Sequence, residues 1–461
     1  TERYDSLVLS PGASPIRPKL PGIENDHVFT LRNIPDVSAI DAFITSRKPA
    51  SCAVIGAGFI GMEMAENLLK RGLKVSVIEA ASHVMAPIDG DMAHEVHNYA
   101  RSKGIDLYLE KLCTGITDRT VLLDDGTEVS AELVLMSVGV MPETAFLKGS
   151  GLALGRRGEI LVNDYLETSV KDVYALGDAA STVNIVSGAA GLIPLAGPAN
   201  KQARIVADNI CGRKTAYSGS QGTSIMKFFD MTVACTGEKE EALKKRQEKY
   251  LKSITFSNSH AGYYPGSEMM GIKLIFTPKD GLLLGAQIVG GKGVDKRIDD
   301  FSTAIRLKKT VYDLQELEFA YAPPFSAAKD PVNMAGYTAA NILEGRMAPY
   351  YAEEVSTIPP DALRVDVRTA EEYDGGHIDG FVNIPLEELR QRIHEFVPQK
   401  KAYITCQIGL RGYIAQRILA QRGFEVKNLS GGYQMYAAMA TDTCQASDTM
   451  HEYTHCGMLK N

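Results

Sequence analysis

Cys406 stands where the chain passes from an apolar run, Ala402 to Thr405, into a segment of helical composition after Leu410. The apolar run predicts a buried strand, so the cysteine is expected at a strand-to-helix turn. At such a turn, backbone N–H groups and the positive end of the helix dipole lower the pKa of a thiol. Arg411 adds a cationic donor for a sulfur-bearing anion. These residues predict a nucleophilic sulfur site, with a buried, inert cysteine as the alternative.

A second set of residues has the spacing of a dinucleotide site. Gly56, Gly58 and Gly61 form a G-x-G-x-x-G pattern between the apolar run Ser51 to Ile55 and a helical segment. The first glycine makes the turn, the second admits a pyrophosphate, and the third lets the helix approach the strand. Glu79 ends the next expected strand, where its carboxylate can bind ribose hydroxyls and repel a 2′-phosphate. The pattern predicts NADH rather than NADPH; a turn without a ligand is the alternative.

Length and composition indicate the kind of protein that carries these sites. The 461 residues predict about three domains. Hydrophobic residues make up 45% and charged residues 23%, a balance typical of globular rather than disordered or fibrous proteins. The formal net charge of −7 comes without a basic block, so we expect no nucleic-acid partner. No apolar run approaches the roughly 20 residues that span a bilayer, so we expect no membrane partner.

The cysteines indicate a redox compartment. The seven are scattered, odd in number and never spaced as C-x-x-C, which fits neither a disulfide framework nor a zinc site. We therefore expect no metal. The opening residues also lack a charged-then-apolar signal peptide. The sequence thus predicts a cytoplasmic protein.

Two short segments resemble the flavin motifs of the pyridine nucleotide-disulfide oxidoreductases, and this resemblance covers about residues 1 to 345. Leu7 to Ala13, LVLSPGA, is similar to the family's strand and A-T-G-A turn, and Val173 to Asp178, VYALGD, is similar to its second FAD motif. The resemblance implies that FAD is contacted by Gly12, Gly177, Asp178 and Ala196. Asp178 would bind the ribityl and pyrophosphate region, with helix capping as the alternative. Ala196 would start a helix whose N-terminus faces the flavin ring.

The same resemblance assigns residues to the nicotinamide end. Glu63 matches a glutamate near flavin and nicotinamide, and Phe59 matches an aromatic residue that gates the nicotinamide pocket. Surface and packing roles on the helix are the alternatives for both. Gly139 lies in GVMP, which is similar to the family's loop beside the nicotinamide, although Glu143 stands where the family has asparagine.

Two further segments resemble one branch of this family. AGYYPG, from Ala261 to Gly266, and YAPPFSAAKDP, from Tyr321 to Pro331, are similar to segments of coenzyme A disulfide reductases and NADH:persulfide reductases. The resemblance implies that Tyr263 and Tyr321 reach the partner subunit's active site, and therefore that the protein is a homodimer. A phenol can donate a proton to a developing thiolate. The alternative for the tyrosines is a role in the core or the interface.

The C-terminal part resembles a rhodanese, a sulfurtransferase. LRVDVRTAEEY, from Leu363 to Tyr373, and GHIDGFVNIP, from Gly376 to Pro385, are similar to the rhodanese signature. The resemblance implies that Cys406 carries sulfane sulfur, and the short loop after it fits sulfur better than phosphate. Rhodaneses usually place arginine after the cysteine, where this chain has Gln407.

The family opens with another G-x-G-x-x-G and a redox cysteine, and the sequence contains neither in that place. The chain instead reaches an apolar, strand-like pattern at Tyr4 to Ser10. We therefore expect that roughly 100 residues of a dinucleotide-binding start are missing and that the chain as given binds FAD weakly.

These observations predict an α/β fold: an interrupted pair of Rossmann-type FAD and NAD domains, an α+β dimerisation domain and a C-terminal α/β rhodanese domain. The expected ranges are 1–45 and 159–222 for the FAD-binding remnant, 46–158 for NAD(H), 223–345 for dimerisation, 346–358 for a linker, 359–440 for rhodanese, and 441–461 for a tail without regular structure.

The resemblance implies a function that joins the two kinds of site. NADH would reduce FAD, and the flavin would reduce persulfide, polysulfide or coenzyme A disulfide, coupled to sulfur transfer through Cys406. A small thiol or persulfide, such as that of coenzyme A, is the expected substrate partner. The alternatives are an NADH oxidase or peroxidase of the same fold, and a non-redox persulfide carrier.

Overall fold

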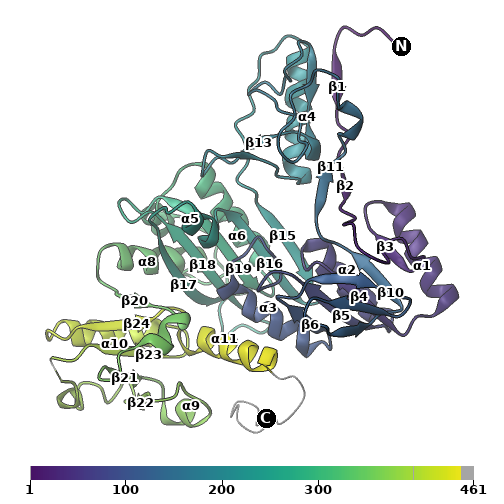
Figure 1. Cartoon of the computed structure of the whole chain (residues 1–461). Coiled ribbons are helices and arrows are strands. Elements are labelled where there is room, and N and C mark those ends of the chain that lie inside the picture. The colour runs from purple at the N-terminus through teal and green to yellow at the C-terminus, as the bar shows by residue number, and fades with distance from the viewer. Residues whose placement is uncertain (1, 398, 448–461) are drawn as a thin grey trace. The chain divides into compact units, whose positions relative to one another are not determined.

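The computed structural model describes residues 2–397 and 399–447. It forms two compact units, one of residues 1–87 with 100–229 and one of residues 88–99 with 230–461. Helices alternate with parallel strands in the first unit and at the end of the second, and an antiparallel sheet lies in the second (Figure 1). The predicted fold class is therefore confirmed. Within the described ranges, no helix is long and apolar enough to cross a membrane.

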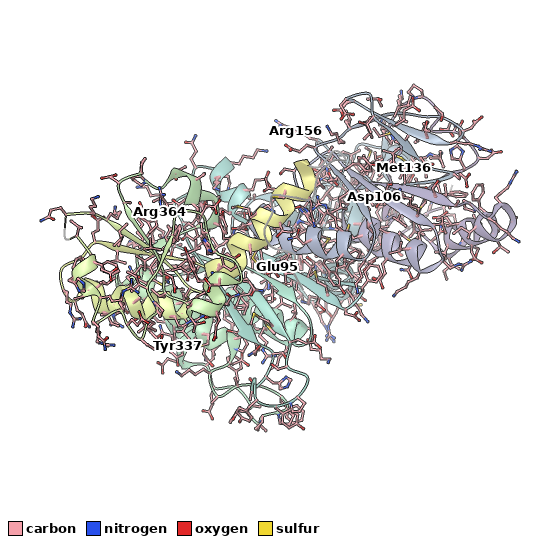
Figure 2. All side chains as sticks on the ribbon, turned by 90° about the horizontal axis from the view of Figure 1, so that it is seen from below. Glu95, Asp106, Met136, Arg156, Tyr337 and Arg364 are labelled. Atoms are coloured by element: carbon pink, nitrogen blue, oxygen red, sulfur yellow. The ribbon has the colours of Figure 1, made fainter. Side chains whose placement is uncertain are left out.

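The main sheet of the first unit carries the glycine turn. Its parallel strands run in the order β3 (Val28–Thr30), β10 (Leu133–Met136), β4 (Ser51–Ile55), β5 (Lys74–Glu79) and β6 (Asp106–Leu109). β4 has the predicted bounds and β5 ends at Glu79 as predicted, and every residue of β4 and β10 is buried, as expected of central parallel strands. Helix α2 (Phe59–Lys70) crosses from β4 to β5. Asp106 on β6 and Met136 on β10 are labelled in Figure 2.

The position of β3 differs from the sequence assignment. The sequence assigns residues 1–45 to the FAD-binding remnant, but β3 pairs in parallel with β10, with Val28 opposite Val134. Helix α1 (Ile34–Arg47) follows, capped by Asn33. A three-residue strand has too short a pattern to reveal which sheet it joins, because pairing is decided by residues about 100 positions away.

Segments far apart in sequence pair in a second part of the first unit. β1 (Leu7–Leu9) pairs in parallel with β12 (Val173–Ala175), and the short helix η2 (Gly177–Ala179) follows β12. β2 (Ala13–Pro15) pairs antiparallel with β11 (Val140–Pro142). Helix α4 runs over Ala196–Ile210. Smaller elements of the unit are β7 (Cys113–Ile116), β8 (Thr120–Leu123), β9 (Glu128–Ser130), η1 (Ala145–Leu147), β13 (Thr182–Val183), β14 (Ala190–Gly191) and β15 (Ser224–Phe228).

The second unit contains an antiparallel sheet with helices packed on it. Its strands are β16 (Met231–Gly237), β19 (Leu283–Gly290), β18 (Met269–Phe276) and β17 (Leu251–Asn258). Helix α6 (Val294–Arg306) packs on β16 and β19, and α8 (Pro331–Leu343) packs on β17 and β18. The other helices of this part are α3 (Gly90–Ser102), α5 (Glu240–Lys245) and α7 (Val311–Glu316).

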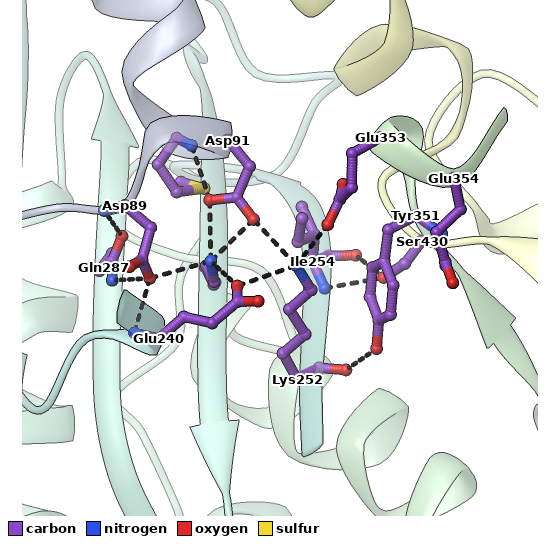
Figure 3. A network of polar contacts seen from close by, with 12 residues as sticks. Asp89, Asp91, Glu240, Lys252, Ile254, Gln287, Tyr351, Glu353, Glu354 and Ser430 are labelled. Atoms are coloured by element: carbon purple, nitrogen blue, oxygen red, sulfur yellow. Dashed lines mark hydrogen bonds and ion pairs between the residues drawn. The ribbon is translucent and has the colours of Figure 1, made fainter. Parts of the chain in front are cut away.

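Two buried lysines hold this sheet to neighbouring segments (Figure 3). Carboxylates surround them, and these come from Asp89, Asp91, Glu240 and Glu353. Lys273 on β18 is fully buried, with its Nζ 2.7 Å from an oxygen of Asp91 and of Glu240 and 2.9 Å from Asp89. Lys252 on β17 contacts Glu353 at 2.8 Å, in the helix η3 (Ala352–Thr357) of the linker. The cluster is a buried ion network, which is costly to form but more costly to break.

The C-terminal domain is a five-stranded parallel sheet. The strand order is β20 (Pro349–Tyr350), β24 (Val426–Leu429), β23 (Ala402–Thr405), β21 (Leu363–Asp366) and β22 (Val382–Asn383). Helices α9 (Ala370–Asp374), α10 (Leu410–Ala420) and α11 (Gly432–Ser447) and the short η4 (Ile393–Glu395) complete it. The prediction that regular structure ends at residue 440 is wrong, because α11 continues to Ser447. Residues 448–461 of the expected tail lie outside the described residues.

Candidate functional site

The glycine turn between β4 and α2 has one glycine that faces open space and two that the fold itself requires. Gly56 has φ +99°, and a Cβ there would lie 2.3 Å from Ser137 O. A Cβ on Gly61 would lie 2.0 Å from Gly56 O. Gly58 has φ −76°, and a Cβ there would meet no atom within 4 Å. The turn therefore holds space over Gly58 that no side chain of the described residues fills.

The surroundings of Gly58 fit the phosphates and ribose of a dinucleotide. Gly58 is the N-cap of α2 and makes no side-chain cap, so the first N–H groups of the helix are left for an anion. Glu79 Oε2 accepts a hydrogen bond from Ala57 N at 2.7 Å, and its Oε1 accepts one from Ala81 N at 2.9 Å. A carboxylate has further acceptor capacity, so Glu79 can bind ribose hydroxyls while it fixes the turn. Gly56, Gly58, Gly61 and Glu79 thus lie together.

Phe59 and Glu63 lie on the first turns of α2. Phe59 is half-buried and Glu63 is exposed. Partial desolvation, followed by the neighbouring charge of Glu66, raises the pKa of Glu63. The carboxyl group therefore takes up a proton more readily than an ordinary surface glutamate.

The FAD candidates gather around the ends of β1 and β12. Gly12 and Gly177 both have positive φ, +74° and +75°. Gly177 N donates to Gln202 Oε1 of α4 at 2.7 Å, which ties the turn to that helix. Asp178 accepts no hydrogen bond from the described residues, so its oxygens remain for hydroxyl donors of a ligand. Ala196 is exposed at the start of α4, which has no side-chain cap. These features fit the part of FAD that the resemblance assigns to them.

Gly139 is joined to the FAD candidates by the pairing of β2 with β11. It has φ +102°, and its carbonyl accepts from Ile16 N at 3.0 Å. Glu143 N donates to Gly12 O at 2.9 Å, and the Glu143 carboxylate accepts from Ser14 Oγ. The glutamate that replaces the family's asparagine therefore holds the segment of Gly12.

Tyr263 and Tyr321, which are 58 positions apart, meet on the surface of the second unit. Their hydroxyl oxygens lie 3.2 Å apart, and the side chains are 78% and 50% exposed. The hydrogen bond to Tyr321 raises the pKa of Tyr263, so the Tyr263 phenol stays protonated at neutral pH. Two large aromatic side chains that are exposed and paired offer adjacent proton donors to a molecule that docks there.

Cys406 follows β23 directly, and its thiol is buried in the loop before α10. Gly409 N donates to Cys406 Sγ at 3.1 Å, and Gly409 has φ +97° as the N-cap of α10. Burial raises the pKa of the Cys406 thiol, while the N–H groups of Gly412, Ile408 and Gly409 and the charge of Arg411 lower it. The groups expected to lower the thiol pKa are all present. The prediction of a lowered pKa is nevertheless wrong, because the desolvation of the buried thiol outweighs their effect.

Backbone hydrogen bonds from the start of α11 hold the loop that contains Cys406. Tyr433 N donates to Cys406 O at 2.7 Å, and Gln434 N donates to Gln407 O at 3.0 Å. The adjacent Asp366–Arg368 pair is fully buried and bonds at 2.7 Å. The Cys406 backbone is therefore rigid, and its N–H groups converge on the sulfur position as they would around an anion.

Arg411 is engaged by a residue that the sequence analysis did not single out. Its Nη1 and Nη2 donate to the two oxygens of Glu372 on α9 at 2.7 and 2.6 Å. This bond holds the pKa of Glu372 at about 2. Thr369 and Glu372 form a capping box, and the T-x-x-E spacing in the sequence was the signal that could have identified Glu372 as ordered at this place.

A cavity of about 400 Å³ borders the loop of Cys406. The loop contributes Ile408, Gly409 and Leu410 to its wall, and the antiparallel sheet contributes Ile254 and Phe256 of β17. The mostly apolar side chains of this wall give space beside the loop for the carbon part of a ligand.

Comparison with known proteins gives a consistent set of relatives. Residues 1–203 match the model of the pyridine nucleotide-disulphide oxidoreductases, residues 223–331 match the dimerisation domain of that family, and residues 351–439 match the rhodanese-like domain. A coenzyme A disulfide reductase of Staphylococcus haemolyticus (strain JCSC1435) is 37% identical over 340 residues, 74% of this chain and 76% of that protein.

Two solved structures are similar over nearly the whole chain. The reduced CoADR-RHD of Bacillus anthracis has a TM-score of 0.94 and 45% identity, covering 96% of this chain and 80% of that one. An NAD-dependent persulfide reductase from A. fulgidus has a TM-score of 0.89 and 36% identity, covering 94% and 80%. The chain belongs to the pyridine nucleotide-disulphide oxidoreductase family and carries a rhodanese-like domain.

Proposed function

We propose that this protein is an FAD-dependent NADH oxidoreductase that reduces persulfide, polysulfide or coenzyme A disulfide, and that it exchanges sulfane sulfur through Cys406. FAD, when bound, supplies two-electron transfer between NADH and a sulfur centre. For a persulfide the balance is RSSH + NADH + H⁺ giving RSH + H₂S + NAD⁺. We place this reaction in the cytoplasm, because no disulfide joins two cysteines of the described chain.

The geometry around Cys406 carries the proposal. The N–H groups that converge on Cys406 Sγ at a helix N-terminus would stabilise a negatively charged sulfur there, against the burial that raises the pKa of the resting thiol. The adjoining cavity gives room for the carbon chain of a thiol larger than thiosulfate. We infer that the sulfur carrier is a low-molecular-weight thiol such as coenzyme A.

The other residues supply nucleotide binding and proton donation. Gly58 admits the pyrophosphate and Glu79 binds the ribose, so NADH is preferred over NADPH. Gly12, Gly177, Asp178 and the start of α4 hold part of FAD. Tyr263 and Tyr321 donate protons to a departing thiolate in the partner subunit's site, which makes the active form a homodimer.

The decisive experiment follows two signals in one reaction. The chain is mixed with FAD, NADH and coenzyme A persulfide, and the loss of NADH absorbance is followed together with sulfide release. Coupled loss of NADH and release of sulfide in equal amounts supports the proposal. Thiosulfate sulfurtransfer without any loss of NADH would reduce the assignment to a persulfide carrier. Faster NADH consumption by oxygen or peroxide than by persulfide would point to an oxidase.

A further inference from the structure

Three metal-ligating side chains meet between two helices of the second unit, at residues that the proposed function does not use. His94 and His97 lie on α3, and Asp442 lies on α11 of the C-terminal domain. The Nδ1 atoms of His94 and His97 are 2.6 and 2.7 Å from the same oxygen, Oδ2 of Asp442. One carboxylate oxygen therefore lies between two imidazole nitrogens.

The position of the cluster is fixed by its helices. Residues three apart on a helix share one face, so α3 presents His94 and His97 side by side to α11. Asn98 Nδ2 donates to Ala438 O at 2.8 Å, which holds the two helices together beside the cluster. The His97 side chain is 1% exposed and Asp442 is 7% exposed, whereas His94 is 24% exposed. One side of the cluster is therefore open to water.

The same interface contains buried oxygen atoms without donors. Asn98 Oδ1 and Gln445 Oε1 have no hydrogen-bond partner in the described part of the chain. Asn98 is four residues after His94, and Gln445 is three residues after Asp442, so both lie on the helix faces that carry the cluster. Each of these two oxygens can accept a hydrogen bond from a water molecule that is bound to a metal ion in the interface.

The donor set and spacing fit a metal ion of the zinc class. Ligand atoms of His94, His97 and Asp442 all lie within 4.8 Å of one another. Zinc bonds of about 2.0–2.2 Å place tetrahedral ligands about 3.3 Å apart, so the rings need to separate by less than about 1 Å. Two imidazoles and one carboxylate leave a fourth position for water on the open side of His94.

The second acidic cluster of this unit provides a contrast. Asp89, Asp91 and Glu240 are also close enough to share an ion. The ammonium of Lys273 already lies among them at 2.7 to 2.9 Å. That cluster is neutralised by the protein itself, whereas the histidine cluster offers two imidazole nitrogens and one carboxylate as ligand atoms.

We propose that His94, His97 and Asp442 bind one divalent transition-metal ion, with Zn²⁺ as the reference ion, and that this ion clamps α11 of the rhodanese-like domain to α3. Neither NADH turnover nor sulfur transfer passes through it. Its effect is on the stability of the contact between the two helices.

The test uses the full chain after removal of metal with a chelator. Zn²⁺ is titrated by calorimetry and thermal unfolding is measured with and without it. Co²⁺ then replaces Zn²⁺, because its visible spectrum reports tetrahedral geometry and its near-ultraviolet spectrum reveals thiolate ligands. We expect one ion per chain, a higher unfolding temperature and a cobalt spectrum without thiolate bands.

Variants assign the site to these residues. His94→Ala and Asp442→Asn should weaken Zn²⁺ binding by about 100-fold or more. Even the loss of a residue that only hydrogen-bonds to a metal ligand lowers metal affinity by about 10- to 100-fold, and these variants remove a ligand itself. His394→Ala removes an exposed histidine elsewhere and should leave binding unchanged. Since His94 is the most exposed member, His94→Gln serves as the variant that keeps the fold. Unchanged affinity in the His94 variants, thiolate bands with Co²⁺, or no rise in unfolding temperature would overturn the proposal.

Discussion

The ion pair between Arg411 and Glu372 sets how much positive charge reaches Cys406. Both terminal nitrogens of the guanidinium, Nη1 and Nη2, donate hydrogen bonds to the Glu372 carboxylate. Its charge therefore acts on the thiol only in part, and burial keeps the thiol pKa raised. The negative charge of Glu372 also opposes the approach of an anionic sulfur donor.

Replacing Glu372 by glutamine should make Cys406 a better acceptor of sulfur from thiosulfate. A partly exposed ion pair is worth up to about 1 kcal/mol, so we expect KM for thiosulfate to fall by up to about 5-fold. The pH profile of sulfurtransfer should move to lower pH, because the freed arginine stabilises the thiolate. Steady-state kinetics across pH measure both effects. Glu371→Gln, at an exposed neighbour on α9, is the control; equal effects from both variants would contradict the prediction.

Gly58→Ala separates nucleotide binding from folding. The φ of −76° suits alanine, and its Cβ would meet no protein atom within 4 Å. We expect an unchanged unfolding temperature but at least about 10-fold weaker NADH binding, since the methyl group occupies the place of the pyrophosphate. Gly61→Ala, whose Cβ would press on Gly56 O, should instead lower the unfolding temperature. Fluorescence titration with NADH checks this, and full affinity in Gly58→Ala would refute the position of the pyrophosphate.

At the level of elements, the buried lysines of β17 and β18 join the antiparallel sheet to α3, α5 and the linker. Lys273→Met should destabilise the second unit by roughly 3–5 kcal/mol, because it leaves carboxylates buried without a partner. Lys279→Met, at an exposed position, should change stability little. Denaturant unfolding of both variants gives the comparison.

The same cluster predicts how stability depends on pH. Burial opposes the charged form of Asp89 and Glu240, but Lys273 outweighs it, so the pKa of each carboxyl is lowered. A group with a lowered folded-state pKa stabilises the fold above its unfolded pKa of about 4 and loses that contribution as pH falls below it. We expect a steep loss of unfolding temperature below about pH 4 in the native chain and a shallower one in Lys273→Met. If unfolding temperature fell with pH equally in the native chain and in Lys273→Met, the ion network would not be the source of the pH dependence.

At the scale of the whole molecule, the residues of the proposed function are spread over both units. The nucleotide turn belongs to the first unit, whereas the tyrosine pair and Cys406 belong to the second. Because the tyrosine pair and Cys406 have different proposed roles, variants of each should separate the two activities. The double variant Tyr263→Phe with Tyr321→Phe should lower NADH-dependent persulfide reduction by about 10²-fold or more, since a positioned proton donor contributes that much. It should leave thiosulfate transfer by Cys406 intact.

Cys406→Ser is the complementary variant. It should abolish sulfurtransfer from thiosulfate, because serine forms no persulfide, while NADH binding stays unchanged. Both activities are measured on the same preparations. If the tyrosine variant loses sulfur transfer and NADH reduction together, the two functions are not separate and the assignment of the phenols is wrong.

The sequence determined the elements whose signal is local. The strand Ser51–Ile55 with its glycine turn, the strand that ends at Glu79 and the strand before Cys406 are all present as predicted. An apolar run and its neighbouring glycines are set by residues close in the chain. The rhodanese and nucleotide motifs also indicated the family. The chemistry expected of these motifs follows from their residue types and from the spacing of those residues.

Only the tertiary structure decided which distant residues meet. It placed β3 in the nucleotide sheet, joined Tyr263 to Tyr321, paired Arg411 with Glu372, and brought His94 and His97 to Asp442, about 350 positions away. It also reversed the expected direction of the Cys406 pKa. Hydrogen bonds to the thiol can be inferred from a strand-to-helix turn, but burial depends on every segment that packs around it, and no local pattern in the sequence records that.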